Sequence, residues 1–201
     1  MNRALITAVS VSLSAMAIPA VADAAVTINI TNVGSDVVAT VSGSLDLTGL
    51  TAEYSFSSVE FAIRGSPTFV GTGSVSQPVI SFSGFTGPLS IGPGTNVVYA
   101  DSSEGGIFAF NGGSYGFPLV FVVPSFVSGS SLTGSSTFLG ASLASLGLTS
   151  GQYVYTSTAD RITFNVGAAV PAPAAWILMT AGFGLVGGAM RTRRRSNARW
   201  A

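Results

Sequence analysis

Three residue types are missing from this 201-residue chain, which contains no cysteine, no histidine and no lysine. Without cysteine the protein can form no disulfide bond, no thiolate nucleophile and no cysteine-based zinc or iron–sulfur site. Without histidine it lacks the commonest general base and the commonest transition-metal ligand. The Gly-x-Ser-x-Gly nucleophile elbow is also absent from any strand-to-helix context, which argues against a serine hydrolase. We therefore expect no cofactor and no metal, and we predict that the protein is not an enzyme.

Charged residues are few and unevenly placed. Eight basic and eight acidic residues give a formal net charge of zero. Six of the eight arginines lie near the chain ends, and residues 25–167 keep only Arg64 and Arg161 against seven acids, so two minus seven gives a formal charge of −5 there. Because nucleic-acid binding requires a basic surface, we expect no nucleic-acid partner.

The acidic residues of the middle segment are the only candidates for catalysis or metal binding. Two carboxylates about 5–10 Å apart could hydrolyse a glycosidic bond, but acids scattered over a β domain are more often a solvated face. Asp101 and Glu104 lie in a glycine-ended loop whose oxygen ligands would suit Ca²⁺. Their spacing does not match an EF-hand, and an ordinary polar turn is the favoured alternative to a calcium site.

The N-terminus has the pattern of a secretory signal peptide. A basic residue precedes an uncharged run over residues 4–18, and a proline and small residues follow. Ala22 and Ala24 fit the Ala-x-Ala cleavage site, which predicts removal of residues 1–24 and a mature N-terminus at Ala25. Cleavage after Ala22 is the near alternative. An uncleaved N-terminal anchor is the competing interpretation, but the apolar run is short for a membrane span.

Residues 25–168 are long enough for one ordinary domain with its own core. Val26, Ile28 and Ile30 alternate with polar residues, which is the period of a half-buried strand. Other short runs rich in β-branched and aromatic residues lie at 37–41, 54–64, 68–70, 79–82, 96–99, 107–110, 119–123, 152–156 and 161–166. Glycine, serine and proline clusters separate them. This pattern predicts an all-β fold, a single antiparallel β-sandwich of the jelly-roll-like kind.

The best helix candidate inside this domain is residues 138–148. Leu139, Leu143 and Leu146 fall at i, i+4 and i+7, the spacing of one helical face. Two glycines weaken the pattern, and a further β pair is an equal alternative. A phase change at Ser57 and Ser58 predicts a β-bulge in the run over 54–64.

Aromatic residues of the β-rich segment are candidates for stacking on sugar rings. The candidates are Tyr99, Tyr115, Phe117, Tyr153 and Tyr155. Aromatic residues in β-rich runs more often pack in the core or against a cross-strand neighbour. We therefore expect packing, with glycan binding as the alternative.

Residues 169–201 have the composition of a membrane-inserted tail. Residues 174–190 carry no charge, and as a helix they would span about 26 Å against a hydrocarbon core of roughly 30 Å. An arginine-rich segment, 191–201, follows; by the positive-inside rule it stays cytoplasmic and leaves the preceding domain outside. The stop-transfer residues are Arg191, Arg193, Arg194 and Arg195.

A short motif over residues 170–176 precedes this predicted transmembrane helix, and it consists of Val170, Pro171, Ala172, Pro173 and Trp176. The motif, the apolar helix and the terminal arginines together resemble the PEP-CTERM sorting signal, in a Val-Pro-Ala-Pro variant with alanine in the place of the name-giving glutamate. The resemblance implies cleavage within the proline motif by an exosortase in the inner membrane of a Gram-negative, exopolysaccharide-making bacterium. It also implies delivery to the cell surface or extracellular matrix.

The sequence therefore predicts a non-enzymatic secreted or cell-surface protein, a component of the extracellular polysaccharide or biofilm matrix. It would be exported through its signal peptide and held briefly in the inner membrane by its C-terminal helix. The expected partners are an exosortase-type processing enzyme, the membrane and extracellular polysaccharide. Two alternatives stay open: a glycan-binding surface adhesin, and an uncleaved single-pass inner-membrane protein with an external β domain.

Overall fold

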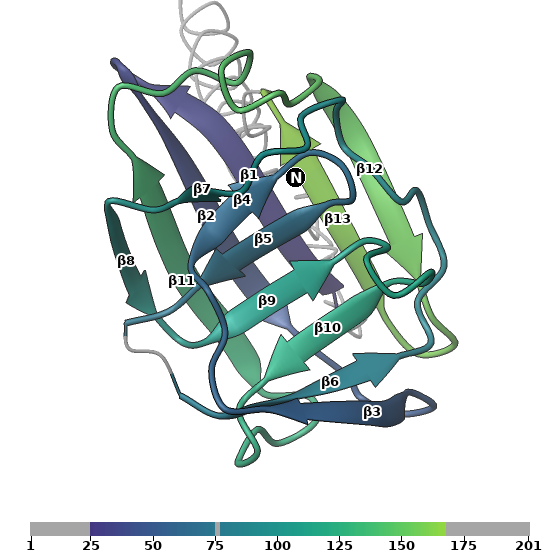
Figure 1. The fold of residues 1–201 in the computed structure, drawn as a ribbon. Helices are drawn as coiled ribbons and strands as arrows, with labels where there is room; N and C mark the ends of the chain where they lie inside the picture. Colours follow the sequence, from purple (N-terminus) through teal and green to yellow (C-terminus); the bar gives the residue numbers. More distant parts are fainter. Residues whose placement is uncertain (1–24, 75–76, 168–201) are drawn as a thin grey trace, which may run out of the picture.

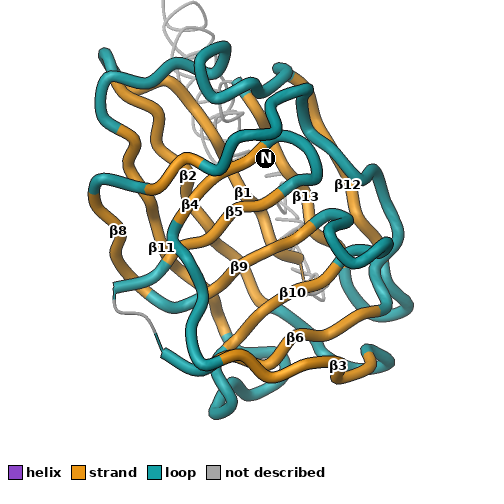
Figure 2. Tube along the Cα trace, in the orientation of Figure 1, coloured by secondary structure: helices purple, strands orange, loops and turns teal. Residues whose placement is uncertain are grey.

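Every regular element in the computed structural model, which describes residues 25–74 and 77–167, is a β-strand (Figure 2). The strands are β1 (Ala25–Val33), β2 (Asp36–Ser44), β3 (Thr51–Phe56), β4 (Ala62–Arg64), β5 (Phe69–Thr72), β6 (Val79–Ser83), β7 (Val98–Tyr99), β8 (Ser102–Gly105), β9 (Phe108–Asn111), β10 (Leu119–Val122), β11 (Ser131–Phe138), β12 (Gly151–Thr156) and β13 (Arg161–Val166). Within these ranges no helix is long and apolar enough to cross a membrane. The all-β prediction is confirmed; the expected signal peptide and C-terminal helix lie outside the described residues.

The strands form two sheets that lie in two layers (Figure 1). Sheet A has the order β12-β13-β1-β2-β11-β8, and sheet B has the order β3-β6-β10-β9-β5-β4-β7. All neighbouring pairs are antiparallel except β1 and β13, which are parallel. The expected antiparallel pairing therefore holds for the other neighbouring pairs but not for this one. A parallel pair needs a long connection, and here it joins the first and last strands of the described domain.

Sheet A has one buried apolar face and one polar face that points outward. In β1 the side chains of Val26, Ile28 and Ile30 are fully buried, and the residues between them are half-buried and polar. The same alternation runs through β13. Because successive side chains of a strand point to opposite faces, the apolar set faces sheet B and the polar set faces outward.

Sheet B carries apolar residues on both faces. All four residues of β9 and all four of β10 are buried. Phe108 and Phe110 belong to the core shared with sheet A, whereas Ala109 between them belongs to a second apolar cluster with Leu119 and Phe121. That second cluster lies on the outer face of sheet B, so sheet B contributes to two separate apolar layers.

Three aromatic rings join the two sheets across the shared core. Phe110 of sheet B lies 4.5 Å from Tyr155 and 5.1 Å from Phe164, between ring centroids, and these two sheet A rings are 5.4 Å apart. All three side chains are fully buried. Tilted and edge-on contacts of this kind add to the free energy gained by burying the rings.

A polar contact also links the sheets, near β5, β8 and β11. The Ser136 hydroxyl donates to the Gly71 carbonyl (2.9 Å) and shares a hydrogen bond with the Ser103 hydroxyl (2.7 Å). The Gly73 N–H donates to Ser103 (3.0 Å). These hydroxyls satisfy backbone groups where the layers are too close for large side chains.

Apart from Phe138, which ends β11, the segment 138–148 forms neither a helix nor a further β pair but a single capped turn. Ser142 and Ser145 cap its start, because the N–H of each donates to the hydroxyl of the other (2.8 and 3.1 Å). At its end Gly147 has a φ of +64°, and the Leu148 N–H donates to the carbonyl five residues before it (2.8 Å). This is a Schellman-type cap, and it ends the segment as a single turn that does not continue into a helix.

Candidate functional site

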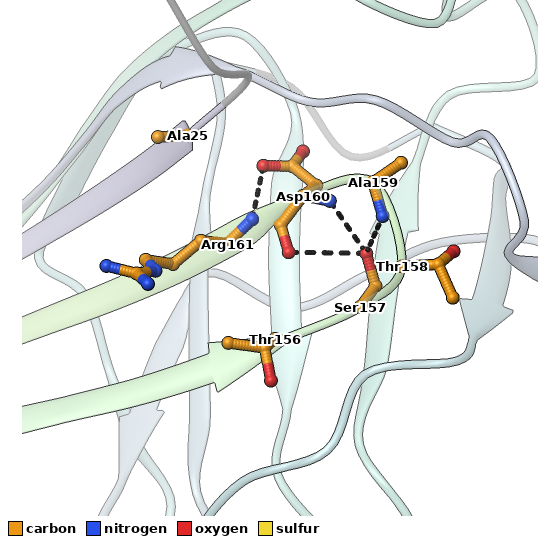
Figure 3. A pocket seen from close by; sticks show the side chains of 7 residues that line it. All are labelled: Ala25, Thr156, Ser157, Thr158, Ala159, Asp160 and Arg161. Atoms are coloured by element: carbon orange, nitrogen blue, oxygen red, sulfur yellow. Dashed lines mark hydrogen bonds between the residues drawn. The ribbon is translucent and has the colours of Figure 1, made fainter.

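An open surface hollow of about 470 Å³ lies beside the turn between β12 and β13, lined by Ala25 and residues 156–161 (Figure 3). Its one acidic side chain, Asp160, is almost fully buried. One carboxylate oxygen accepts from the Arg161 N–H (2.6 Å) and the other from the Asp46 N–H (2.7 Å). The carboxylate therefore ties the β12–β13 turn to the segment that follows β2.

The carboxyl groups of Asp160 and Asp46 have pKa values displaced in opposite directions. Burial raises the pKa of Asp160, although the two backbone N–H donors act in the other direction. Hydrogen bonds from the side chain and backbone of Thr48, and from the Ser128 hydroxyl, lower the pKa of Asp46. Opposed shifts are typical of an acid–base pair. Here, however, both carboxylates receive hydrogen bonds from loop groups, which makes them anchors of the loops.

The two calcium candidates both accept hydrogen bonds from β11 or from the residue that follows it. The Asp101 carboxylate accepts from the Leu139 N–H (2.8 Å), and the Glu104 carboxylate accepts from the Ser135 hydroxyl (3.3 Å). In the part of the chain that the structure describes, no group of three or more His, Cys, Asp or Glu residues could hold a metal ion. The structure therefore adds no third carboxylate to this pair.

The five aromatic candidates divide between core and surface. Tyr155 is fully buried, so packing is confirmed for it, and Tyr153 is half-buried. Tyr99, Tyr115 and Phe117 are 60%, 44% and 38% exposed. The Tyr99 hydroxyl donates to the Glu60 carboxylate (3.0 Å), and this hydrogen bond, with the glutamate charge, raises the pKa of Tyr99.

Tyr115 belongs to a group of four rings on the outer face of sheet B, which we term the outer aromatic cluster: Tyr54, Phe56, Tyr115 and Phe121. Tyr54 and Tyr115 stack with centroids 5.6 Å apart and planes 30° apart. Phe56 meets both tyrosines edge-on, at 6.3 and 6.4 Å, and lies 5.6 Å from Phe121. Phe121 is buried, whereas Tyr54 is 46% exposed. The cluster therefore has a buried base and a half-exposed tyrosine surface.

An irregularity in the pairing of β3 with β6 directs Tyr54 outward. The register shifts between Ala52 and Ser55. The Ser81 hydroxyl fills the gap, accepting from the Tyr54 N–H (3.1 Å) and donating to the Tyr54 carbonyl (3.3 Å). A bulge breaks the strict alternation of side chains. The bulge predicted at Ser57 and Ser58 therefore lies a few residues earlier, inside β3.

Sequence reasoning named Tyr115 but missed Tyr54 and Phe56. Their spacing was the available signal, because residues two apart in a strand lie on one face. Phe56 pairs with the buried Val79 of β6. The spacing alone does not say which face this is; the pairing with Val79 shows that Tyr54 and Phe56 lie on the outer face of sheet B.

The remaining predicted site residues lie outside the described part, apart from Ala25, which begins β1. They are Ala22, Ala24, Val170, Pro171, Ala172, Pro173, Trp176, Arg191, Arg193, Arg194 and Arg195. No protein family, no curated protein and no solved structure matches this chain.

Proposed function

We propose that this is a non-enzymatic secreted or cell-surface protein, sorted through its C-terminal tail and resident in the extracellular polysaccharide matrix. The observation that carries the proposal is the order of its parts: an export-type N-terminus, an acidic all-β domain, and a tail of proline motif, apolar run and arginines. A domain with two sheets and a shared apolar core suits a surface role, because a core of this size can stabilise the fold of a chain without cysteine.

The finer description of the domain belongs to the same proposal. We assign it to the β-sandwich class, with the jelly-roll-like connectivity that the sequence predicts. Residues 1–24 act as the signal peptide, and the segment after residue 168 carries the exosortase-recognised signal. The apolar stretch 174–190 is a marginal span, which suits a segment that holds the chain in the inner membrane only until it is processed.

Mass spectrometry of the surface-associated protein tests the proposal. The expected product begins at Ala25 and ends within or close to Pro171–Pro173. A matched variant with Pro171→Ala and Pro173→Ala should accumulate uncleaved in the inner membrane, whereas Pro124→Ala in the β domain should be processed normally. If the surface form retains residues 174–201, the protein is instead an uncleaved single-pass membrane protein, and alkaline carbonate extraction would leave it in the membrane pellet.

A second candidate function is favoured by the outer aromatic cluster. A matrix protein that binds polysaccharide needs a surface that is apolar in its middle and rich in hydrogen-bonding groups at its edge. Tyr54 and Tyr115 offer ring surface and hydroxyls together, which suits an adhesin that binds glycans.

A further inference from the structure

We propose that the outer aromatic cluster is the binding site for a neutral polysaccharide chain, whose stacking surface is the exposed part of the Tyr54 and Tyr115 rings that lies outside their mutual stack. The inference rests on the proposed extracellular role, which would place the domain among such chains. A pyranose ring has an apolar face of C–H groups and an edge of hydroxyls. It therefore needs a flat aromatic surface bordered by hydrogen-bonding side chains.

The stacking surface is held rigid before any ligand binds. Phe56 contacts both tyrosines and rests against Phe121, which is 5% exposed and belongs to the second apolar cluster of sheet B. In the described part of the chain, neither the Tyr54 nor the Tyr115 hydroxyl hydrogen-bonds to another residue. As far as residues 25–74 and 77–167 go, both hydroxyls are thus available to a ligand, and the rings, already packed against Phe56, lose little conformational freedom on binding.

The loop that carries Tyr115 is also fixed, by hydrogen bonds to a buried side chain. The Asn111 side chain, only 6% exposed, accepts from the Gly113 N–H (3.1 Å) and from the Ser114 N–H (2.8 Å). Its amide group donates to the Ser114 hydroxyl (3.0 Å). Asn111 therefore sets the direction in which the chain leaves β9, immediately before Tyr115.

Polar groups border the cluster on two sides. On the β3 side the Glu53 carboxylate accepts a short hydrogen bond from Ser83. On the β9 side the Arg64 guanidinium donates to the Ser114 hydroxyl (2.7 Å) and to the Pro67 carbonyl (2.8 Å). Both groups keep further hydrogen-bonding capacity, and planar carboxylate and guanidinium groups can bind neighbouring hydroxyls in pairs. Glu53 lies on β3 and Arg64 on β4, which are five strand steps apart in sheet B, and the Arg64 guanidinium reaches Ser114, the residue before Tyr115.

Charge decides between neutral and acidic chains. The described domain carries Arg64 and Arg161 against seven acids, a formal charge of −5. A domain of that sign repels polyanions at a distance. One carboxylate and one guanidinium at the border of the cluster also leave no net positive patch for uronate groups. The structure therefore favours a neutral polysaccharide.

Pull-down by insoluble polysaccharides tests the site. The full chain, purified in mild detergent, is incubated with cellulose, curdlan and mannan as neutral probes and with calcium alginate as the acidic probe. We expect depletion by at least one neutral polysaccharide and none by alginate. Tyr54→Ala and Tyr115→Ala should each weaken binding about two- to tenfold, the range of one lost aromatic contact. Tyr99→Ala is the control, since it removes a still more exposed tyrosine away from the cluster and should leave polysaccharide binding unchanged.

Tyr54→Phe and Tyr115→Phe keep the stacking surface and lose only the hydroxyls, so each should weaken binding less than the matching alanine variant does, with unchanged thermal midpoints. They keep the test valid if the alanine variants lose stability. The proposal is overturned if no neutral polysaccharide depletes the protein, if alginate alone does so, or if Tyr99→Ala weakens binding as much as Tyr115→Ala. It is also overturned if Tyr115→Ala abolishes self-association in sedimentation while polysaccharide binding is absent, because a second copy would then be the occupant. Export and tail processing are measured separately, so either idea can fail alone.

Discussion

The two outer faces of this protein are built from different chemistry. Sheet A presents one continuous row of polar side chains across all six of its strands: Gln152, Asn165, Asn29, Thr40, Ser135 and Glu104. Sheet B presents the outer aromatic cluster over a buried apolar layer. The two sheets share one core, so the core alone does not explain the contrast.

The polar row of sheet A satisfies much of its own hydrogen bonding. The Gln152 amide donates to Asn165 (3.0 Å), and Asn165 donates to Asn29 (2.9 Å). On sheet B the hydroxyls of Tyr54 and Tyr115 make no such bonds within the described residues. Ligands gain little from groups that are already paired. The polar face of sheet A is therefore largely hydrogen-bonded within itself, whereas the aromatic face of sheet B keeps groups that can bind a ligand.

The largest expected effect is the loss of stability when a ring of the shared core is removed, compared with the loss when a ring of the outer aromatic cluster is removed. Phe110→Ala opens a cavity between the sheets and removes two ring contacts, so it should lower the free energy of unfolding by about 3–5 kcal/mol. Phe56→Ala, in the half-exposed outer cluster, should cost about 1–3 kcal/mol because solvent can fill the space. Urea denaturation measures both. Equal losses would show that the outer cluster is part of the main core, which would remove the contrast between the faces.

The next effect tests the buried tyrosine that sheet A contributes to the core. Burial raises the pKa of Tyr155 to about 12, although Thr68 acts in the other direction. The Thr68 hydroxyl donates to the Leu89 carbonyl (3.3 Å), and among the described residues the Tyr155 hydroxyl has no hydrogen-bond partner. The folded state thus holds the phenolic proton more tightly than the unfolded chain, whose tyrosine titrates near pH 10.

Stability should therefore be complete below pH 10 and should fall by about 2–3 kcal/mol as the pH rises from 10 to 12. Urea titrations across this interval measure the loss. Tyr155→Phe is the control; it should remove this part of the pH dependence and cost little at pH 7, because the hydroxyl it deletes is unpaired. An equal alkaline loss in Tyr155→Phe would assign the effect to other groups.

The contrast between the faces also explains which strands could be predicted. In β1, Val26 and Ile28 alternate with polar residues because one face is wet, and the predicted run matches the strand. In β11 the pattern fails. Its inward positions include Ser136 and the neighbouring Gly134, where a Cβ atom would lie 2.7 Å from the Thr72 hydroxyl. Small residues are required there by the close approach of β5, and they erase the apolar signal on which strand prediction depends.

The candidate site was predictable only in part, for a related reason. Tyr115 was recognisable as an aromatic residue in a glycine-rich loop, but its stacking partner Tyr54 lies 61 positions earlier in the chain. The contact depends on β10 lying beside β6 and β6 beside β3, and on the bulge in β3. A sequence pattern reports local periodicity, whereas long-range strand order decides which faces meet.

A smaller effect concerns the support beneath Tyr115. Asn111→Ala leaves the N–H groups of Gly113 and Ser114 without their acceptor, so it should cost about 1–3 kcal/mol of stability. It should also weaken polysaccharide binding in the pull-down, although Asn111 itself is buried. Asn111→Asp keeps the acceptor oxygen and should restore part of the stability. Binding that is unchanged in a folded Asn111→Ala protein would mean that the loop needs no anchor.

The smallest expected effect is the loss of stability at the polar face of sheet A, which should be independent of changes on the outer face of sheet B. Asn165→Ala breaks the amide row of sheet A and should cost about 0.5–1.5 kcal/mol, without any effect on polysaccharide binding. Two packed sheets are about 10 Å apart, so Asn165 and Tyr115 lie on opposite outer faces with the whole core between them. Sites at such a separation with no shared partner add within about 0.3–0.5 kcal/mol. The double variant Asn165→Ala/Tyr115→Ala should therefore show the sum of the two single losses in urea denaturation. A coupling beyond that margin would mean that the core transmits strain from one sheet to the other, and the two faces would then have to be treated as one binding unit.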